Sequence, residues 1–346
     1  MQTNLLSTAI GSMPFDDADY AVSVALKSMD APIWPQLPST SLKEQMEIQY
    51  SENIPCAVVD EVKKRMFFQT DQDYSEQFGE FYEKFEAGDP SFMAISEEYS
   101  KGIYALLKAV KAKGGKLPWL KVQVTGPCSL ALTVVDENKR AMYYNEEFRD
   151  VILKAISMKA RWQIQLFKPY AENIICFIDE PILSAFGSST YVSVKREDVV
   201  EIINEVVEAV HADGALAGVH CCGNTEWSIL IDAGVDIVNF DAFEYAHTIV
   251  MYADGVKKHL ERGGSLAWGV VPTSALIREQ TVESLEQKLE AGMDALAATG
   301  IDKNLILQQA IITPSCGTGS LPIADAEKVF DLLSKLTQKM KGKYKV

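Results

Sequence analysis

Short apolar runs alternate with longer amphipathic stretches from about residue 118 to the end of the chain. Short apolar runs predict buried strands, and apolar residues at every third or fourth position predict helices that pack on one face. The predicted strands are residues 119–124, 174–178, 216–220, 237–241, 266–270 and 305–310. The predicted helices are residues 146–171, 195–213, 226–233, 252–262, 280–299 and 323–341.

This repeated order of strand and helix predicts an α/β protein with a parallel sheet and right-handed crossovers. A first strand is predicted at 7–10, and residues 40–115 are predicted to be helical or irregular, with a short strand or hairpin within 57–68. We therefore expect a (β/α)8 TIM barrel over 1–346, a single domain with an N-terminal helical and irregular excursion. An open doubly wound sheet is the alternative.

Polar residues at the ends of the predicted strands favour the barrel. They are Ser12, Thr125-Gly126-Pro127, Asp179-Glu180-Pro181, His220-Cys221-Cys222-Gly223, Asp241 to Glu244, and Cys316 after the last strand. Barrel enzymes assemble their active sites from the carboxyl ends of many strands. In an open sheet, such residues would gather around one switch point instead.

The formal net charge of −15 disfavours binding to nucleic acids or to anionic membranes. No apolar run reaches the roughly 18 residues of a membrane span, and Met1 to Leu6 lack the basic start of a signal peptide. We therefore expect a cytoplasmic protein with reduced thiols. Its six cysteines are then core residues, metal ligands or nucleophiles.

Three residues form a candidate metal site. His220 and Cys222 are one residue apart after a strand, so both side chains point to the same side, and Cys316 follows the last predicted strand. Two thiolates and one imidazole suit Zn²⁺. The competing interpretation is that the cysteines are ordinary buried side chains. That interpretation is preferred for Cys56, Cys128, Cys176 and Cys221, whereas His211 and His259 are expected on solvated helix faces.

A set of motifs resembles the catalytic domain of the cobalamin-independent methionine synthase family. The set is Ile10-Gly11-Ser12, Val124-Thr125-Gly126-Pro127, Ile178-Asp179-Glu180-Pro181, His220-x-Cys222 and Cys316-Gly317, and it spans residues 7 to 320. The wider superfamily includes uroporphyrinogen decarboxylase and the zinc methyltransferases of methanogens, all of them barrels.

The resemblance implies a zinc-dependent methyltransferase that converts homocysteine to methionine. It implies that His220, Cys222 and Cys316 hold Zn²⁺ and that one carboxylate, Asp241 or Glu244, is a fourth ligand. By the same resemblance, the substrate-binding residues are Ile10, Gly11, Ser12 and Asp179, with Asp179 binding the ammonium of homocysteine, and Gln49 replaces a further acidic contact.

The methyl donor is where the chain departs from the family. Thr133 stands where the family has a tryptophan that contacts the folate pterin. Loss of this stacking surface disfavours methyltetrahydrofolate, so a methyl-corrinoid, carried by a separate protein, is the expected donor. Three alternatives stay open: methylation of another thiol such as coenzyme M, a uroporphyrinogen decarboxylase-like lyase, and a non-enzymatic metal- or corrinoid-binding protein.

Overall fold

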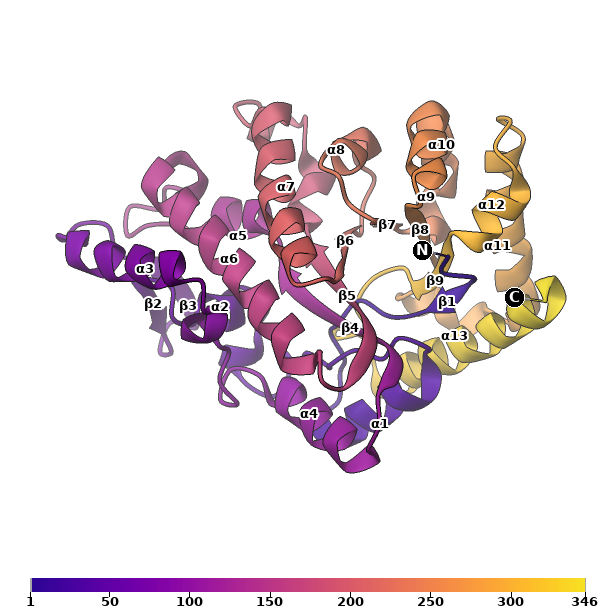
Figure 1. Ribbon diagram of the computed structural model, residues 1–346, viewed down its shortest axis with the longest axis horizontal. Helices are drawn as coiled ribbons and strands as arrows, with labels where there is room; N and C mark the ends of the chain where they lie inside the picture. Colours follow the sequence, from indigo (N-terminus) through magenta and orange to yellow (C-terminus); the bar gives the residue numbers. More distant parts are fainter. Residues whose placement is uncertain (1, 346) are drawn as a thin grey trace.

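The computed structural model describes residues 2–345, and its centre is a curled parallel sheet (Figure 1). Seven strands lie in the order β1-β9-β8-β7-β6-β5-β4, and every neighbouring pair is parallel. Their bounds are β1 Leu6–Ser7, β4 Leu117–Thr125, β5 Ala171–Asp179, β6 Leu216–Cys221, β7 Ile237–Phe240, β8 Ser265–Val271 and β9 Ala310–Pro314. The predicted α/β class is confirmed.

The predicted barrel has eight strands, but the parallel sheet of the described residues has seven. Residues 31–36 lie between the two edge strands and make isolated parallel bridges, Ile33 with Lys121 and Gln36 with Ser12. Pro32 and Pro35 flank Ile33 and Trp34 in this segment. Because proline has no N–H group to donate, it interrupts a continuous ladder of hydrogen bonds.

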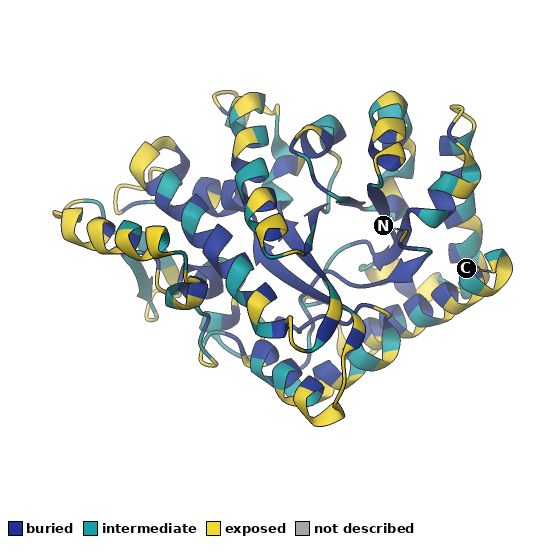
Figure 2. Ribbon diagram, viewed as in Figure 1, coloured by how far each residue is buried: buried dark blue, intermediate teal, exposed yellow. Residues whose placement is uncertain are grey.

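The helices cover the outside of the sheet, with buried positions facing inward and exposed ones facing outward (Figure 2). They are α1 Ala18–Ser28, α4 Lys101–Lys113, α5 Pro127–Thr133, α6 Glu146–Phe167, α7 Arg196–Ala212, α8 Trp227–Asp232, α9 Ala242–Ile249, α10 Ala253–Glu261, α11 Val282–Ala297, α12 Lys303–Gln308 and α13 Ile323–Tyr344. No helix within residues 2–345 is long and apolar enough to cross a membrane.

The predicted N-terminal excursion contains a hairpin and two further helices. Strands β2 (Ala57–Asp60) and β3 (Arg65–Phe68) pair antiparallel, and α2 (Met46–Ser51) and α3 (Ser75–Ala87) flank them. Lys159, buried on α6, donates hydrogen bonds to the carbonyl groups of Glu52 and Met93 at 2.7 and 3.3 Å. These hydrogen bonds hold the N-terminal excursion against helix α6, which packs on the sheet.

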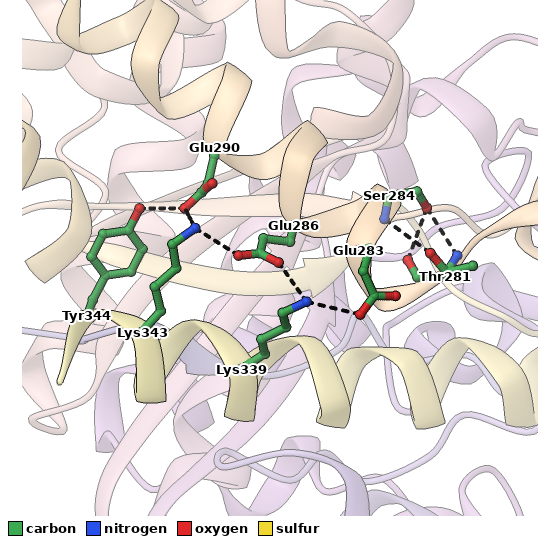
Figure 3. Close-up of polar contacts among 8 residues, drawn as sticks. All are labelled: Thr281, Glu283, Ser284, Glu286, Glu290, Lys339, Lys343 and Tyr344. Carbon is green, nitrogen blue, oxygen red and sulfur yellow. Dashed lines mark hydrogen bonds and ion pairs between the residues drawn. The ribbon is translucent and has the colours of Figure 1, made fainter.

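Helix α13 is held against α11 by a row of surface ion pairs (Figure 3). Lys339 lies 2.8 Å from Glu286, and Lys343 lies 2.8 Å from Glu286 and 2.6 Å from Glu290. Thr281 and Ser284 form a capping box at the start of α11. Exposed pairs of this kind contribute at most about 1 kcal/mol each, so they orient α13 more than they stabilise the fold.

Two sequence predictions were wrong. Residues 305–310 were predicted as a strand, but α12 ends at Gln308 and β9 begins at Ala310. Asp302 accepts a hydrogen bond from the Asn304 N–H and starts a helix, whose apolar residues Ile306 and Leu307 are buried. His259 was expected to be solvated, but it is buried and lies 3.2 Å from the Ser265 carbonyl. Burial lowers the pKa of His259 to about 4.

Glu180 joins β5 to α5 next to the edge of the sheet where polar residues gather. Its buried carboxylate accepts hydrogen bonds from the Cys128 N–H at 2.9 Å and the Ser129 N–H at 2.8 Å. Both donors belong to the first turn of α5, where N–H groups have no partner within the helix. Gly126 permits this contact, because a Cβ there would lie 2.0 Å from Glu180 Cδ.

We predict that Gly126→Ala destabilises the protein by about 1–3 kcal/mol, because the added methyl group displaces the Glu180 carboxylate. The matched control is Gly79→Ala on α3, where no atom lies within 4 Å of the added Cβ. Gly79→Ala should raise the free energy of unfolding by about 0.5–1 kcal/mol, the usual effect of replacing glycine by alanine inside a helix. Urea unfolding of both variants measures the difference, and equal stabilities would contradict the packing described for Glu180.

Candidate metal centre and adjoining cavity

The register of the sheet places four polar side chains in one row at the carboxyl ends of the strands. Thr125 pairs with Asp179, Asp179 with His220, and His220 with Asn239, across β4, β5, β6 and β7. Register partners on neighbouring strands point to the same side of a sheet. Residues far apart in sequence thus become neighbours inside the curled sheet.

His220, Cys222 and Cys316 form a group that could hold a metal ion. One ligand atom from each residue lies within 4.8 Å of the others. His220 is on β6, Cys222 follows β6, and Cys316 follows β9. Gly317 allows the loop that carries Cys316 to approach Ser12, because a Cβ there would lie 2.1 Å from Ser12 Oγ.

Asn239 orients the His220 ring. The Asn239 Nδ2 group donates to the Ala267 carbonyl at 3.0 Å and to Thr313 Oγ1 at 2.9 Å, so its Oδ1 faces His220 Nδ1. An oxygen acceptor keeps the proton on Nδ1 and leaves the lone pair on Nε2. His220 Nε2 is buried and has no hydrogen-bond partner among the described residues, as suits a metal ligand.

The two sulfur atoms of this group shift each other's pKa values in opposite directions. The neighbouring Cys316 thiol and His220 ring lower the pKa of Cys222 far below its usual value, and the neighbouring Cys222 thiolate raises the pKa of Cys316. Two thiolates this close repel each other unless a cation lies between them. The donor set is therefore suited to a bound divalent ion.

A cavity of about 230 Å³ opens beside this group. It is lined by Ile10, Ser12, Gln36, Pro38, Glu44, Met46, Asp179, Pro181, His220, Cys222, Cys316 and Gly317. Asp179 is 6% exposed, and its Oδ1 atom has no hydrogen-bond partner among the described residues. Burial raises the pKa of Asp179, and Lys121 and His220 oppose that rise. The cavity thus combines a possible metal group with an unpartnered carboxyl group.

Of the four other predicted substrate-binding residues, two line this cavity and two do not. Ile10 and Ser12 line it, whereas Gly11 packs against the side chains of Gln36 and Gln123. Gln49 is buried behind the wall, where it accepts a 2.7 Å hydrogen bond from Gln36 Nε2. Its own amide donates to the Tyr99 carbonyl at 2.7 Å, so Gln49 supports Gln36.

The two candidates for a fourth metal ligand lie outside the group. The Asp241 carboxylate caps α9 and accepts a 3.0 Å hydrogen bond from the Glu244 N–H. Burial raises the pKa of Asp241 to about 6. Glu244, on α9, lines a different cavity together with His247 and Lys288 of α11. Within residues 2–345, the cluster therefore contains three residues only.

Three residues of this site were missed in the sequence. Gln36 and Glu44 line the cavity and come from the irregular N-terminal third, where no periodic pattern places them. Asn239 had a usable signal, because it is a polar residue within the apolar run Ile237-Val238-Asn239-Phe240. Polar side chains in a buried strand need a partner, and here that partner is His220.

The fold and site define an α/β protein with a parallel sheet and a Cys2His group at its carboxyl edge. The chain is 26% identical over 208 residues to the protein named methionine synthase from Methanocaldococcus jannaschii, a match that covers 59% of each chain. It therefore spans less than two thirds of that relative's length. The resemblance to methionine synthases, predicted from the motifs, is confirmed by this match.

No family model matches the chain. A B12-independent methionine synthase from Shewanella sp. W3-18-1, solved with selenomethionine, has a TM-score of 0.45 at 13% identity, and covers 69% of this chain and 67% of its own. A protein described as a fructose-1,6-biphosphate aldolase from Coccidioides immitis has a TM-score of 0.27 at 12% identity, with coverages of 69% and 84%.

We predict that Asn239→Leu lowers the affinity for a divalent ion about 10–100-fold, the usual effect of losing the group that orients a metal-binding histidine. Competition with a zinc chelator measures this affinity. The control is Asn173→Ala, because the Asn173 side chain donates its hydrogen bond to the Pro118 carbonyl at the protein surface, away from the metal group. Unchanged affinity in Asn239→Leu would contradict the role given to Asn239.

Proposed function

We propose that this protein is a zinc-dependent methyltransferase that methylates homocysteine to methionine. The observation that carries the proposal is a His-Cys-Cys group beside the buried carboxyl group of Asp179, whose Oδ1 has no hydrogen-bond partner within residues 2–345. A thiol substrate with an ammonium group fits these two features together. We also infer that residues 31–36 act as the eighth strand of a closed barrel, since they bridge to both edges of the sheet.

The residues of the group suit Zn²⁺. Two thiolates and one imidazole are a soft donor set, and catalytic zinc sites keep one position open for water or substrate. Asp241 and Glu244 lie outside the group, so the open position is available to the sulfur of the substrate. Zinc, when bound, supplies a positive charge that lets the substrate thiol lose its proton at neutral pH.

The chain's own residues bind and orient the amino-acid part of the substrate. Asp179 binds the ammonium group, since a buried carboxylate without a partner gains most from a cation. Ser12 and the backbone beside it receive the carboxylate end. Lys121, fully buried, donates a hydrogen bond to the Ile10 carbonyl and fixes the position of this loop.

The charges around the cavity weigh against the two enzymatic alternatives. Among the described residues that line it, Glu44 and Asp179 are acidic and none is a lysine or arginine. The sulfonate of coenzyme M and the carboxylates of a porphyrinogen need cationic partners. A ligand with an ammonium group therefore suits the cavity better than either.

We predict that Cys316→Ser loses its zinc and its methyltransferase activity. The control is Cys221→Ser, because Cys221 is buried next to Cys222 but its thiol contacts the Gly223 carbonyl, not the metal group. Metal content by mass spectrometry, together with methionine formation from homocysteine, checks both variants. A Cys316→Ser protein that keeps zinc and activity would refute the proposed site.

We also predict that Asp179→Asn lowers kcat/KM for homocysteine about 30–1000-fold, as expected when a buried ammonium loses its charged partner. The control substrate is 4-mercaptobutyrate, which has the thiol and the carboxylate of homocysteine but lacks its ammonium group. Its kcat/KM should change little in the variant. Equal losses for both thiols would show that Asp179 does not recognise the ammonium group.

A further inference from the structure

A second cavity of about 170 Å³ adjoins the one beside the metal group. It is lined by Met46, Glu47, Thr125, Ser129, Leu130, Thr133, Pro181, Ile182, Ser184 and Ala185. Met46 and Pro181 also line the first cavity, so the two share a wall. A group bound here would lie beside the proposed position of the substrate thiol.

Two polar groups in this cavity have no partner within the described part of the chain. Thr125 is 1% exposed, and its Oγ1 atom has no hydrogen-bond partner. Buried hydroxyl groups in proteins are nearly always hydrogen-bonded, so an unpartnered one that lines a cavity points to a ligand. Glu47 is half-buried in the cavity wall, and its carboxylate makes no hydrogen bond or ion pair among residues 2–345.

The two cavities together are acidic. Glu44, Glu47 and Asp179 contribute carboxyl groups, and no lysine, arginine or aromatic residue lines either cavity on the described chain except His220. An anionic ligand would meet repulsion here. A planar ring system would find no aromatic side chain to stack on.

We propose that the second cavity binds a small onium methyl donor, in which the methyl group is carried by a positively charged sulfur or nitrogen. The Glu47 carboxylate attracts the positive charge, and the Thr125 hydroxyl bonds to a polar group of the donor. This inference rests on the proposed function, and it replaces the methyl-corrinoid expected from the sequence. A corrin ring or a folate is much larger than this cavity.

The methyl transfer balances without any further reactant. The thiolate sulfur of homocysteine forms a bond to the methyl carbon, and the bond from that carbon to the onium atom breaks. The electron pair of the broken bond stays on the onium atom, which leaves as a neutral thioether or tertiary amine. The proton of the substrate thiol is released to solvent when the thiolate forms.

The test compares methyl donors with the zinc-loaded protein and homocysteine. Dimethylsulfoniopropionate and glycine betaine are the onium donors, and methyltetrahydrofolate and methylcobalamin are the competitors. We expect methionine from an onium donor. In Glu47→Gln the KM for that donor should rise about tenfold, while the KM for homocysteine and the zinc content stay unchanged. The control is Glu76→Gln on α3, whose exposed carboxylate lies outside both cavities.

A binding measurement separates this inference from the proposed function. Trimethylsulfonium should bind the zinc-loaded protein in calorimetry, about tenfold more weakly in Glu47→Gln than in the Glu76→Gln control. It has no polar group for Thr125, so Thr125→Val should bind it unchanged but should bind dimethylsulfoniopropionate more weakly. Such binding supports the donor cavity even if no homocysteine is methylated, an outcome that would refute only the proposed function. Methionine formed only from methylcobalamin or methyltetrahydrofolate, with no binding of trimethylsulfonium, would overturn the inference and leave the methyltransferase proposal intact.

Discussion

The parallel register of β4, β5, β6 and β7 is the constraint on which the site depends. It sets Thr125, Asp179, His220 and Asn239 side by side, although they come from four separate strand–helix units. Each strand ends at the same edge, so the loops that follow bring Cys222 and Cys316 to the same place. If one strand shifted by one residue, its polar side chain would point outward toward the helices, and the four side chains would no longer lie next to one another.

Electrostatics decides what this row can bind. Asn239 Oδ1 pairs with His220 Nδ1, whereas His220 Nε2, Asp179 Oδ1 and Thr125 Oγ1 are buried and have no hydrogen-bond partner among the described residues. Unpaired buried polar atoms cost free energy, about 1–3 kcal/mol each, and a protein tolerates several in one place when a ligand satisfies them. The proposed metal ion, ammonium group and methyl donor would each satisfy one of these three atoms.

Much of this arrangement was predictable because motif residues mark the ends of regular strands. The apolar runs predicted the positions of strands β4 to β8. The polar residues that follow them indicated that the candidate site lies at the carboxyl ends of these strands. Prediction failed where local chemistry competes with the apolar pattern. Asp302 caps a helix, so an apolar run predicted as a strand forms α12 instead, and residues 31–36, which include Pro32 and Pro35, make only isolated bridges. Gln36 and Glu44 reach the cavity by tertiary packing alone, which no local pattern encodes.

We propose that a thiol substrate binds directly to a metal ion held by His220, Cys222 and Cys316. Cobalt(II) in place of zinc reports this binding, because cobalt–thiolate bonds absorb strongly in the near ultraviolet. We expect the cobalt protein to show this absorption, and we expect homocysteine to increase it by adding a further sulfur ligand. A cobalt protein whose spectrum does not change with homocysteine, or a chain that binds no cobalt at this group, would contradict it.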